Sequence, residues 1–292
     1  MSRPTYLAQH ARKLDLHLYE YLFESADVQP VLDDLATYQN KDGGFGHALE
    51  PDMRLPDSST LATTVAFQYL VQLPADSASP LVLGAVQFLL ETYDPAKNGW
   101  VNIPPRADHF PRAPWWNYTG ALQGTDWGNP SAEVLGYLLR YANKIEHGEL
   151  LHNLTDRAVQ RLLEIQEPEQ HEIKCFIRLY ENAGEDLQAK LHSSLAEHIK
   201  QAANTNQAEW QGYVATPLTF ITSPDSPFAD LFSHDLLMQN IEHLRAQEID
   251  GDHWEPNWEW SQFEAEWTRA RKEWSGKLTV DNLQILRAFG AL

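Results

Sequence analysis

Residues 39–46 read Gln39-Asn40-Lys41-Asp42-Gly43-Gly44-Phe45-Gly46, and a similar stretch at residues 247–254 reads Gln247-Glu248-Ile249-Asp250-Gly251-Asp252-His253-Trp254. Each stretch lies between two segments whose apolar residues recur at helical spacing. The Asp-Gly pair favours a turn that ends a helix, because glycine tolerates a positive φ. An aromatic residue follows the turn in both copies. The sequence therefore predicts a repeated unit of helix, turn, aromatic residue, loop and helix.

A third and weaker copy runs from Asp94 to Trp100, with the turn and the aromatic residue but without the leading glutamine. After each copy an irregular polar loop precedes a second helix with an apolar stripe. We expect these second helices to begin near Ser58-Ser59-Thr60, at Pro130 with Asn129 as the N-cap, and near Leu278-Thr279. Strand-like alternation is nearly absent, so the sequence predicts an all-α fold.

The pattern Gln-x-x-Asp-Gly-Gly-Phe-Gly resembles the QW repeat of squalene and oxidosqualene cyclases and of the β-subunits of protein prenyltransferases. The resemblance is good over residues 39–70, fair over 247–290 and weak over 94–142. It implies an α/α toroid, which is a barrel of inner and outer helices with long irregular loops at one end. We expect residues 1–292 to form one such domain. The cyclases carry two such barrels in one chain, so this sequence departs from them in size.

The sequence lacks the catalytic and zinc-binding motifs of these families. The Asp-x-Asp-Asp motif with which squalene-type cyclases protonate their substrate does not occur in the sequence. Prenyltransferase β-subunits bind zinc through an aspartate, a cysteine and a histidine, but Cys175 lies on a predicted helix without that surrounding pattern, and we interpret it as a small apolar core residue. The sequence has no Gly-rich phosphate loop, no Gly-x-Ser-x-Gly elbow and no recognised metal-ligand spacing. We therefore expect no cofactor and no metal.

The charge balance argues against several classes of partner. Lysine and arginine number 22 against 41 aspartate and glutamate residues, for a net charge of −19. Nucleic acid is therefore not expected as a partner, because phosphate backbones are bound by cationic side chains. No apolar run approaches the roughly 20 residues of a spanning helix, so we expect no membrane insertion. One cysteine and a first segment without an apolar core favour cytoplasmic residence. The oligomeric state is not indicated.

In a toroid the long loops gather at one end, so their acidic and aromatic side chains would surround one mouth. Carboxylates there could act as general acid and base, and tryptophan rings could stack on a ligand. The candidate catalytic residues are Glu50, Asp52, Asp126 and Glu255. The candidate ligand-binding residues are His47, Asp57, Asp108, Arg112, Trp115, Trp116, Trp127, Trp258 and Trp274, and Glu133 and Glu259 belong to the same group of loop-end acids. Each of them could instead be a packing anchor, a helix cap or a solvated side chain.

These residues support two functional hypotheses. In the first, an acidic, Trp-rich pocket binds and transforms a small, mostly uncharged molecule, either an isoprenoid-like hydrocarbon or a carbohydrate. A deep aromatic cavity would favour the isoprenoid, whereas an open acidic groove with two carboxyl groups would favour glycoside chemistry. In the second, a non-catalytic binding or scaffold protein keeps the toroid without its catalytic motif. The sequence leaves open whether the chain is an enzyme.

Overall fold

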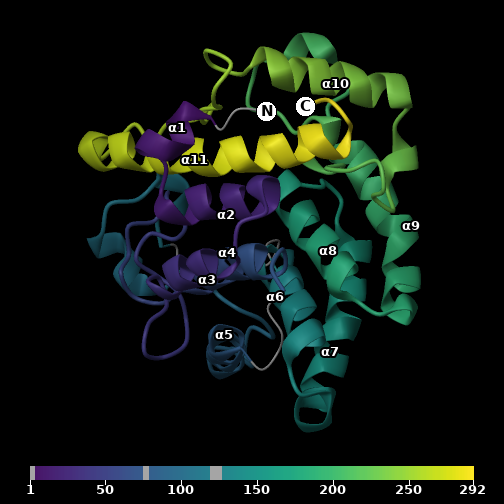
Figure 1. Cartoon of the computed structure of the whole chain (residues 1–292). Helices are drawn as coiled ribbons and strands as arrows, with labels where there is room; N and C mark the ends of the chain where they lie inside the picture. Colours follow the sequence, from purple (N-terminus) through teal and green to yellow (C-terminus); the bar gives the residue numbers. More distant parts are fainter. Residues whose placement is uncertain (1–3, 75–78, 119–126) are drawn as a thin grey trace. The chain divides into compact units, whose positions relative to one another are not determined.

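The structure, a computed structural model, describes residues 4–74, 79–118 and 127–292 (Figure 1). Within these residues the chain forms helices α1 to α11, five short 3₁₀ turns and isolated bridges, with no β-strand. The predicted all-α class is confirmed. The toroidal arrangement of the helices stays a prediction.

The chain divides into two compact units. Unit 1 comprises Met1–Thr37, Arg112–Pro114 and Ala203–Leu292, and unit 2 comprises Tyr38–Pro111 and Trp115–Ala202. Each unit has fully buried apolar side chains of its own, among them Leu14 and Ile241 in unit 1 and Phe67 and Leu135 in unit 2.

Unit 1 is built around a long helix near the C-terminal end of the chain. Its helices are α1 (Thr5–His10), α2 (Lys13–Glu24), α3 (Gln29–Ala36), α10 (His234–Ala246) and α11 (Glu264–Ala288). Helix α11 packs against α1 and α2, and α2 packs against α3 (Figure 1). Leu14 and Leu18 of α2 are buried, as their four-residue spacing on one helix face predicts.

The beginning of α11 differs from the prediction. The helix begins at Glu264, well before the expected Leu278-Thr279. Gly276 favours a helix boundary in the sequence, but it lies inside α11, where an added Cβ would be 2.7 Å from the Cβ of Ala11. The glycine therefore permits close packing against the segment between α1 and α2 instead of ending a helix.

In unit 2 a buried helix, α4, packs against its neighbours α5 and α6. The helices of this unit are α4 (Thr60–Leu70), α5 (Pro80–Glu91), α6 (Gly128–Tyr141), α7 (Lys144–Glu164), α8 (Gln170–Asn182) and α9 (Glu185–Ala202). Helix α6 packs against α4, α5, α7 and α8, and α9 packs against α7 and α8. Helix α4 begins at Thr60, within the predicted stretch, and Ser59 caps it by accepting a hydrogen bond from the N–H of Ala62 at 3.0 Å. Asn129 has non-helical φ and ψ, so the regular turns of α6 follow from Pro130.

One hydrogen bond recurs at the three turns, which we call the first turn (39–45), the middle turn (94–100) and the last turn (247–254). In each, the backbone N–H of the aromatic residue donates to a hydroxyl on the helix that comes next in the chain. The three pairs are Phe45 to Thr63 (3.1 Å), Trp100 to Ser131 (3.1 Å) and Trp254 to Thr279 (3.2 Å). An antiparallel bridge closes each turn. The three turns are thus joined to their next helices in the same way.

The first turn also packs tightly on α5. Gly43 has a φ of +83°, and an added Cβ would lie 2.3 Å from the carbonyl oxygen of Gly84. The side-chain amide of Gln39 donates to the carbonyls of Gly43 and Leu81 at 2.9 and 3.1 Å. Gly251 of the last turn has a φ of +64° but no neighbour within 4 Å of an added Cβ. The two turns therefore differ in how closely they are packed.

Candidate functional site

The loop after the first turn, residues 47–59, is largely buried although it has no regular structure; we call it the acidic loop. Residues 48–53 are all buried, and the exposed fractions of Glu50 and Asp52 are only 6% and 3%. Loops usually run over the surface, and carboxylates are seldom buried. Two enclosed carboxylates in one irregular loop therefore distinguish this part of unit 2.

The backbone of the acidic loop is strained. His47 and Ala48 have φ values of 54° and 62°, which place two consecutive non-glycine residues in the left-handed region. Each such residue costs about 1 kcal/mol or more. The N–H of His47 donates to the carbonyl of Pro56 at 3.3 Å, and the N–H of Met53 donates to that of Glu50 at 3.1 Å. Strain of this kind persists where the surroundings hold it, and it gathers at functional sites.

A second segment, residues 102–118, belongs to unit 2 apart from Arg112–Pro114, and it is hydrogen-bonded to the acidic loop and to the start of α4. The N–H of Arg54 donates to the carbonyl of Pro111 at 3.0 Å, and the N–H of Leu61 donates to that of Asn102 at 2.9 Å. An apolar cluster joins the two segments. It consists of the buried residues Met53, Leu55, Leu61, Ile103 and Ala107, with Phe110, Trp116 and Tyr118 packed against it.

Trp116 brings an unpaired donor to this cluster. Its indole N–H is buried, and it has no hydrogen-bond partner among the described residues. A buried donor without an acceptor costs about 1–3 kcal/mol. The neighbouring Trp115 is 50% exposed, so part of its ring is accessible. The acidic loop and the segment 102–118 thus combine carboxylates, an unpaired donor and an accessible aromatic ring.

Three predicted ligand-binding residues of this region have local partners. The contacts are Asp57 Oδ2 to Arg106 Nη1 (2.7 Å), Asp108 Oδ1 to the backbone N of Tyr118 (3.0 Å) and His47 Nε2 to Asn40 Oδ1 (2.9 Å). The carboxylate of Asp57 and the guanidinium of Arg106 are both exposed, so their ion pair contributes little to stability. These contacts shape the surface beside the acidic loop.

Trp127 and Asp126 stand apart from this region. Trp127 is buried, and its indole N–H donates to the carbonyl of Asn98 in the middle turn at 2.6 Å. The guanidinium of Arg157 lies 5.6 Å from the centre of its ring. These contacts are those of a packing residue. Asp126, predicted as a catalytic residue, lies outside the described residues.

The remaining predicted residues belong to unit 1. The rings of Trp258 and Trp274 meet edge to face, with centroids 5.2 Å apart. Trp274 lies on α11 and not on a loop, which corrects the prediction, because the helix begins earlier than its sequence suggests. The backbone carbonyl of Arg112 accepts a hydrogen bond from the side chain of Gln262 at 2.8 Å. The single mouth expected of a toroid stays a prediction.

Glu255, the last predicted catalytic residue, forms an ion pair in unit 1. Its Oε2 contacts Nη2 of Arg271, a residue of α11. The side chains are 29% and 52% exposed respectively, so solvent screens this pair. The carboxylate of Glu255 therefore lies in a wetter environment than those of Glu50 and Asp52.

No protein-family model, curated protein or solved structure matches the chain. Among the residues that the structure describes, no three His, Cys, Asp or Glu side chains gather to hold a metal ion. None of the described helices is both long enough and apolar enough to span a bilayer.

A buried polar network in unit 2 surrounds Glu133, which the sequence groups with the loop-end acids. Its Oε1 accepts from Gln68 Nε2 (2.9 Å) and the Tyr137 hydroxyl (2.6 Å), and its Oε2 accepts from Arg178 Nη1 (2.9 Å) and Cys175 Sγ (3.5 Å). Burial, followed by the Glu133 charge, raises the pKa of both the Tyr137 hydroxyl and the Cys175 thiol, so both remain donors. With four donors on one carboxylate, the network joins α4, α6 and α8.

The position of Cys175 confirms part of the prediction. The residue is buried on α8, as expected of a small core residue, but its thiol also contacts a carboxylate. No local pattern indicates this contact, because Glu133 and Cys175 come from separate helices. Its surroundings make it a protonated, enclosed thiol and not a nucleophile.

Proposed function

We propose that the chain binds a small, uncharged, hydroxyl-bearing molecule in unit 2, at the acidic loop and residues 102–111 and 115–118. The observation that carries this proposal is the buried, unpaired indole N–H of Trp116 on the same apolar cluster as Met53 of the acidic loop. A ligand hydroxyl would accept from this donor, and a ligand ring would stack on the exposed part of Trp115.

The same donor favours a carbohydrate-like ligand over an isoprenoid. A hydrocarbon placed against Trp116 would leave the indole N–H unpaired, and burying an unpaired polar group is costly. Sugar rings present apolar faces to aromatic rings and hydroxyls to carboxylates. Glu50 and Asp52 lie on the loop that contributes Met53 and Leu55 to the cluster, and in this proposal they accept from such hydroxyls.

Turnover of the ligand would fall to the same two carboxylates. An acid and a base on one loop could cleave a glycosidic bond, with one carboxyl group protonating the leaving oxygen and the other activating water or attacking carbon. In this proposal Glu50 and Asp52 take these roles.

A non-catalytic binding or scaffold role is the second candidate. It is favoured by the contacts of Asp57, Asp108 and Glu255, whose carboxylates are all used in local contacts. Under this candidate no small molecule binds the acidic loop. In both candidates we propose that the chain acts in the cytoplasm and binds neither nucleic acid nor membranes.

Binding is tested by screening neutral mono- and oligosaccharides, with the hydrocarbon farnesene as the isoprenoid probe, against the wild type and two variants. Trp116→Phe keeps the ring and removes the donor, so we expect about tenfold weaker saccharide binding, which is about 1.4 kcal/mol. Trp115→Ala removes the stacking face and should weaken binding further. Trp267→Phe, a substitution in unit 1, is the matched control and should change nothing.

Two outcomes would contradict the proposal: binding of farnesene but of no saccharide, or undiminished saccharide binding by Trp116→Phe. Catalysis is tested separately on any saccharide that binds. Glu50→Gln and Asp52→Asn should each abolish cleavage while folded protein still binds the sugar. Absence of cleavage by the wild type would leave binding as the function and remove the catalytic roles.

A further inference from the structure

Unit 1 holds a small cavity, open to solvent, that the proposed function does not use. Its volume is about 240 Å³, and its lining residues are Tyr6, His10, Glu255, Thr268, Arg271 and Lys272. Helix α1 contributes two of them four residues apart, and α11 contributes three at spacings of three and four, so each helix presents one face to the cavity. Glu255 comes from the loop after the last turn.

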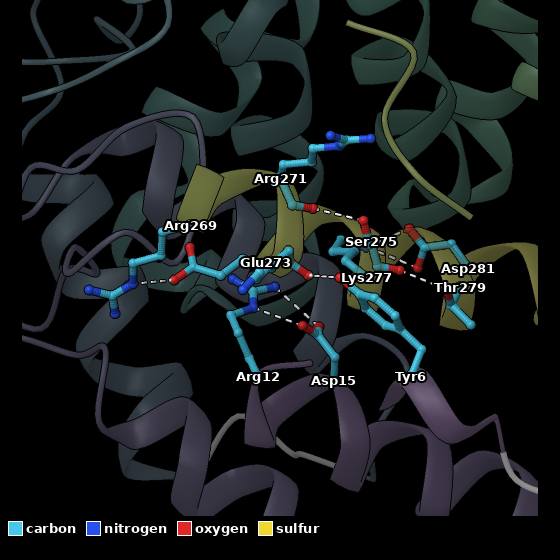
Figure 2. A network of polar contacts seen from close by, with 11 residues as sticks. Tyr6, Arg12, Asp15, Arg269, Arg271, Glu273, Ser275, Lys277, Thr279 and Asp281 are labelled. Atoms are coloured by element: carbon cyan, nitrogen blue, oxygen red, sulfur yellow. Dashed lines mark hydrogen bonds and ion pairs between the residues drawn. The ribbon is translucent and has the colours of Figure 1, made fainter. Parts of the chain in front are cut away.

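The walls of this cavity are tied together by specific contacts. The carboxylate of Asp252 in the last turn accepts from the backbone N–H groups of Thr5 and Tyr6 at 2.5 and 2.8 Å, which holds the first turn of α1. The ring of Tyr6 stacks on His253 with centroids 4.0 Å apart. Its hydroxyl, directed at α11 in Figure 2, donates to the carbonyl of Lys272 at 3.4 Å. The last turn, α1 and α11 thus form one continuous wall.

The charges of the residues that line the cavity do not cancel. Glu255 is paired with Arg271, while the ammonium of Lys272 has no ion-pair partner among the described residues. The lining side chains therefore carry one excess positive charge, and the carboxylate of Asp252, which is not among them, is held by the backbone N–H groups of α1. The guanidinium of Arg271 is 52% exposed and has five N–H donors, more than its contact with Glu255 uses.

We propose that this cavity binds a small organic anion through a carboxylate or phosphate group. Arg271 and Lys272 would hold the oxyanion, because a planar guanidinium and an adjacent ammonium match its oxygens. The rings of Tyr6 and His10, whose centroids lie 5.2 Å apart, would contact the body of the ligand. The volume is below that of sites for drug-sized ligands, so the ligand has at most about one ring.

The test is a titration of the protein with inorganic phosphate, benzoate or neutral benzyl alcohol at constant ionic strength. Binding is monitored through the backbone amide chemical shifts. We expect saturable shifts at Tyr6, His10, Thr268 and Lys272 with phosphate or benzoate. Saturation with phosphate alone would show that the cavity recognises a phosphate group. Saturation with benzoate alone would show that it recognises a carboxylate attached to a ring. The variant Lys272→Gln, at an exposed position, should weaken the response about tenfold.

Arg269→Gln is the matched control. Arg269 lies on the same helix, where it pairs with Glu273 at 2.9 Å (Figure 2). It is not among the residues that line the cavity. Its substitution should leave anion binding unchanged. Shifts that do not saturate, equal loss in both variants, no loss in Lys272→Gln or equal binding of benzyl alcohol would each overturn the proposal. These residues all belong to unit 1, so this outcome is independent of the saccharide test in unit 2.

Discussion

The first and last turns begin alike and end differently. In both, the N–H of an aromatic residue donates to a threonine of the next helix, Thr63 or Thr279. Helix α4 begins only one turn before its threonine, at Thr60, whereas α11 begins far ahead of its own, at Glu264. The turn itself therefore has a structural role, and the chemistry depends on the segment between the turn and its threonine.

The consequence is seen in the acids after each turn. The extra length of α11 carries Arg271, which pairs with Glu255 in a partly exposed position. The acidic loop has no such helix before α4, and Glu50 and Asp52 are enclosed within it. A similar sequence thus gives a screened ion pair in unit 1 and two buried carboxylates in unit 2. Function is better sought where the carboxylates are buried.

The largest difference between the turns should appear in their glycines. In Gly43→Ala the new methyl would meet the Gly84 carbonyl and force a positive φ on alanine, so we expect a loss of about 2–5 kcal/mol in the free energy of unfolding. Gly251→Ala meets no neighbour and should lose about 1–2 kcal/mol from φ alone. Urea unfolding of both variants measures this. Equal losses would show that the two turns are packed alike.

Substitutions of carboxylates should destabilise unit 2 more than unit 1, with smaller losses of unfolding free energy than the glycine substitutions give. Glu133→Gln leaves the Arg178 cation without its buried partner, so we expect a loss of about 3 kcal/mol. Glu255→Gln removes an ion pair that solvent already screens, so its loss should stay below about 1 kcal/mol. Guanidinium unfolding with matched m-values compares them. A larger loss for Glu255→Gln would reverse the distinction between buried and screened acids.

The shared hydrogen bond should give similar results at both turns. Thr63→Val and Thr279→Val keep the shape and leave a buried N–H unpaired, so each should lose about 1–3 kcal/mol. Thr268→Val, which removes an exposed hydroxyl on α11, serves as the control and should be nearly neutral. Thermal unfolding is sufficient to compare them. A neutral result at one of the two turns would mean that they are not equivalent.

The smallest expected effect is an alkaline loss of stability that unit 2 contributes through Cys175. Its pKa is raised in the folded state, so the folded protein retains a proton that the unfolded chain loses above pH of about 8.5. Stability is therefore full below that pH and falls as pH rises, by at most about 1.4 kcal/mol per pH unit. Cys175→Ala should flatten this part of the profile. Identical profiles for the wild type and the variant would contradict the buried, protonated thiol.

Local features made the helices and turns predictable. The start of α4 at Thr60, the Asp-Gly pairs and the leucine stripes each depend on a few neighbouring residues, and the structure has them where the sequence places them. The beginning of α11 was not predictable in this way, because the role of Gly276 depends on Ala11, which is distant in the sequence. The misplacement of Trp274 on a loop has the same cause.

The candidate site was predictable in composition but not in environment. Glu50, Asp52, Trp115 and Trp116 were selected because acidic and aromatic residues gather on the loops. The burial of Glu50 and Asp52 was not predictable, since a polar loop sequence is typical of an exposed segment. The network around Glu133 was also missed, because Gln68, Cys175 and Arg178 reach it from two other helices.

The most direct test of the comparison is the indole N–H resonance of Trp116 during titration with neutral saccharides. Trp116→Phe assigns this signal among the ten tryptophans. We predict a saturable shift of the Trp116 signal with at least one saccharide, and no shift of the Trp254 signal at the last turn. A Trp116 signal that stays unchanged with every saccharide, or that shifts only with the hydrocarbon farnesene, would contradict the assignment of the acidic loop as a site for hydroxyl-bearing ligands.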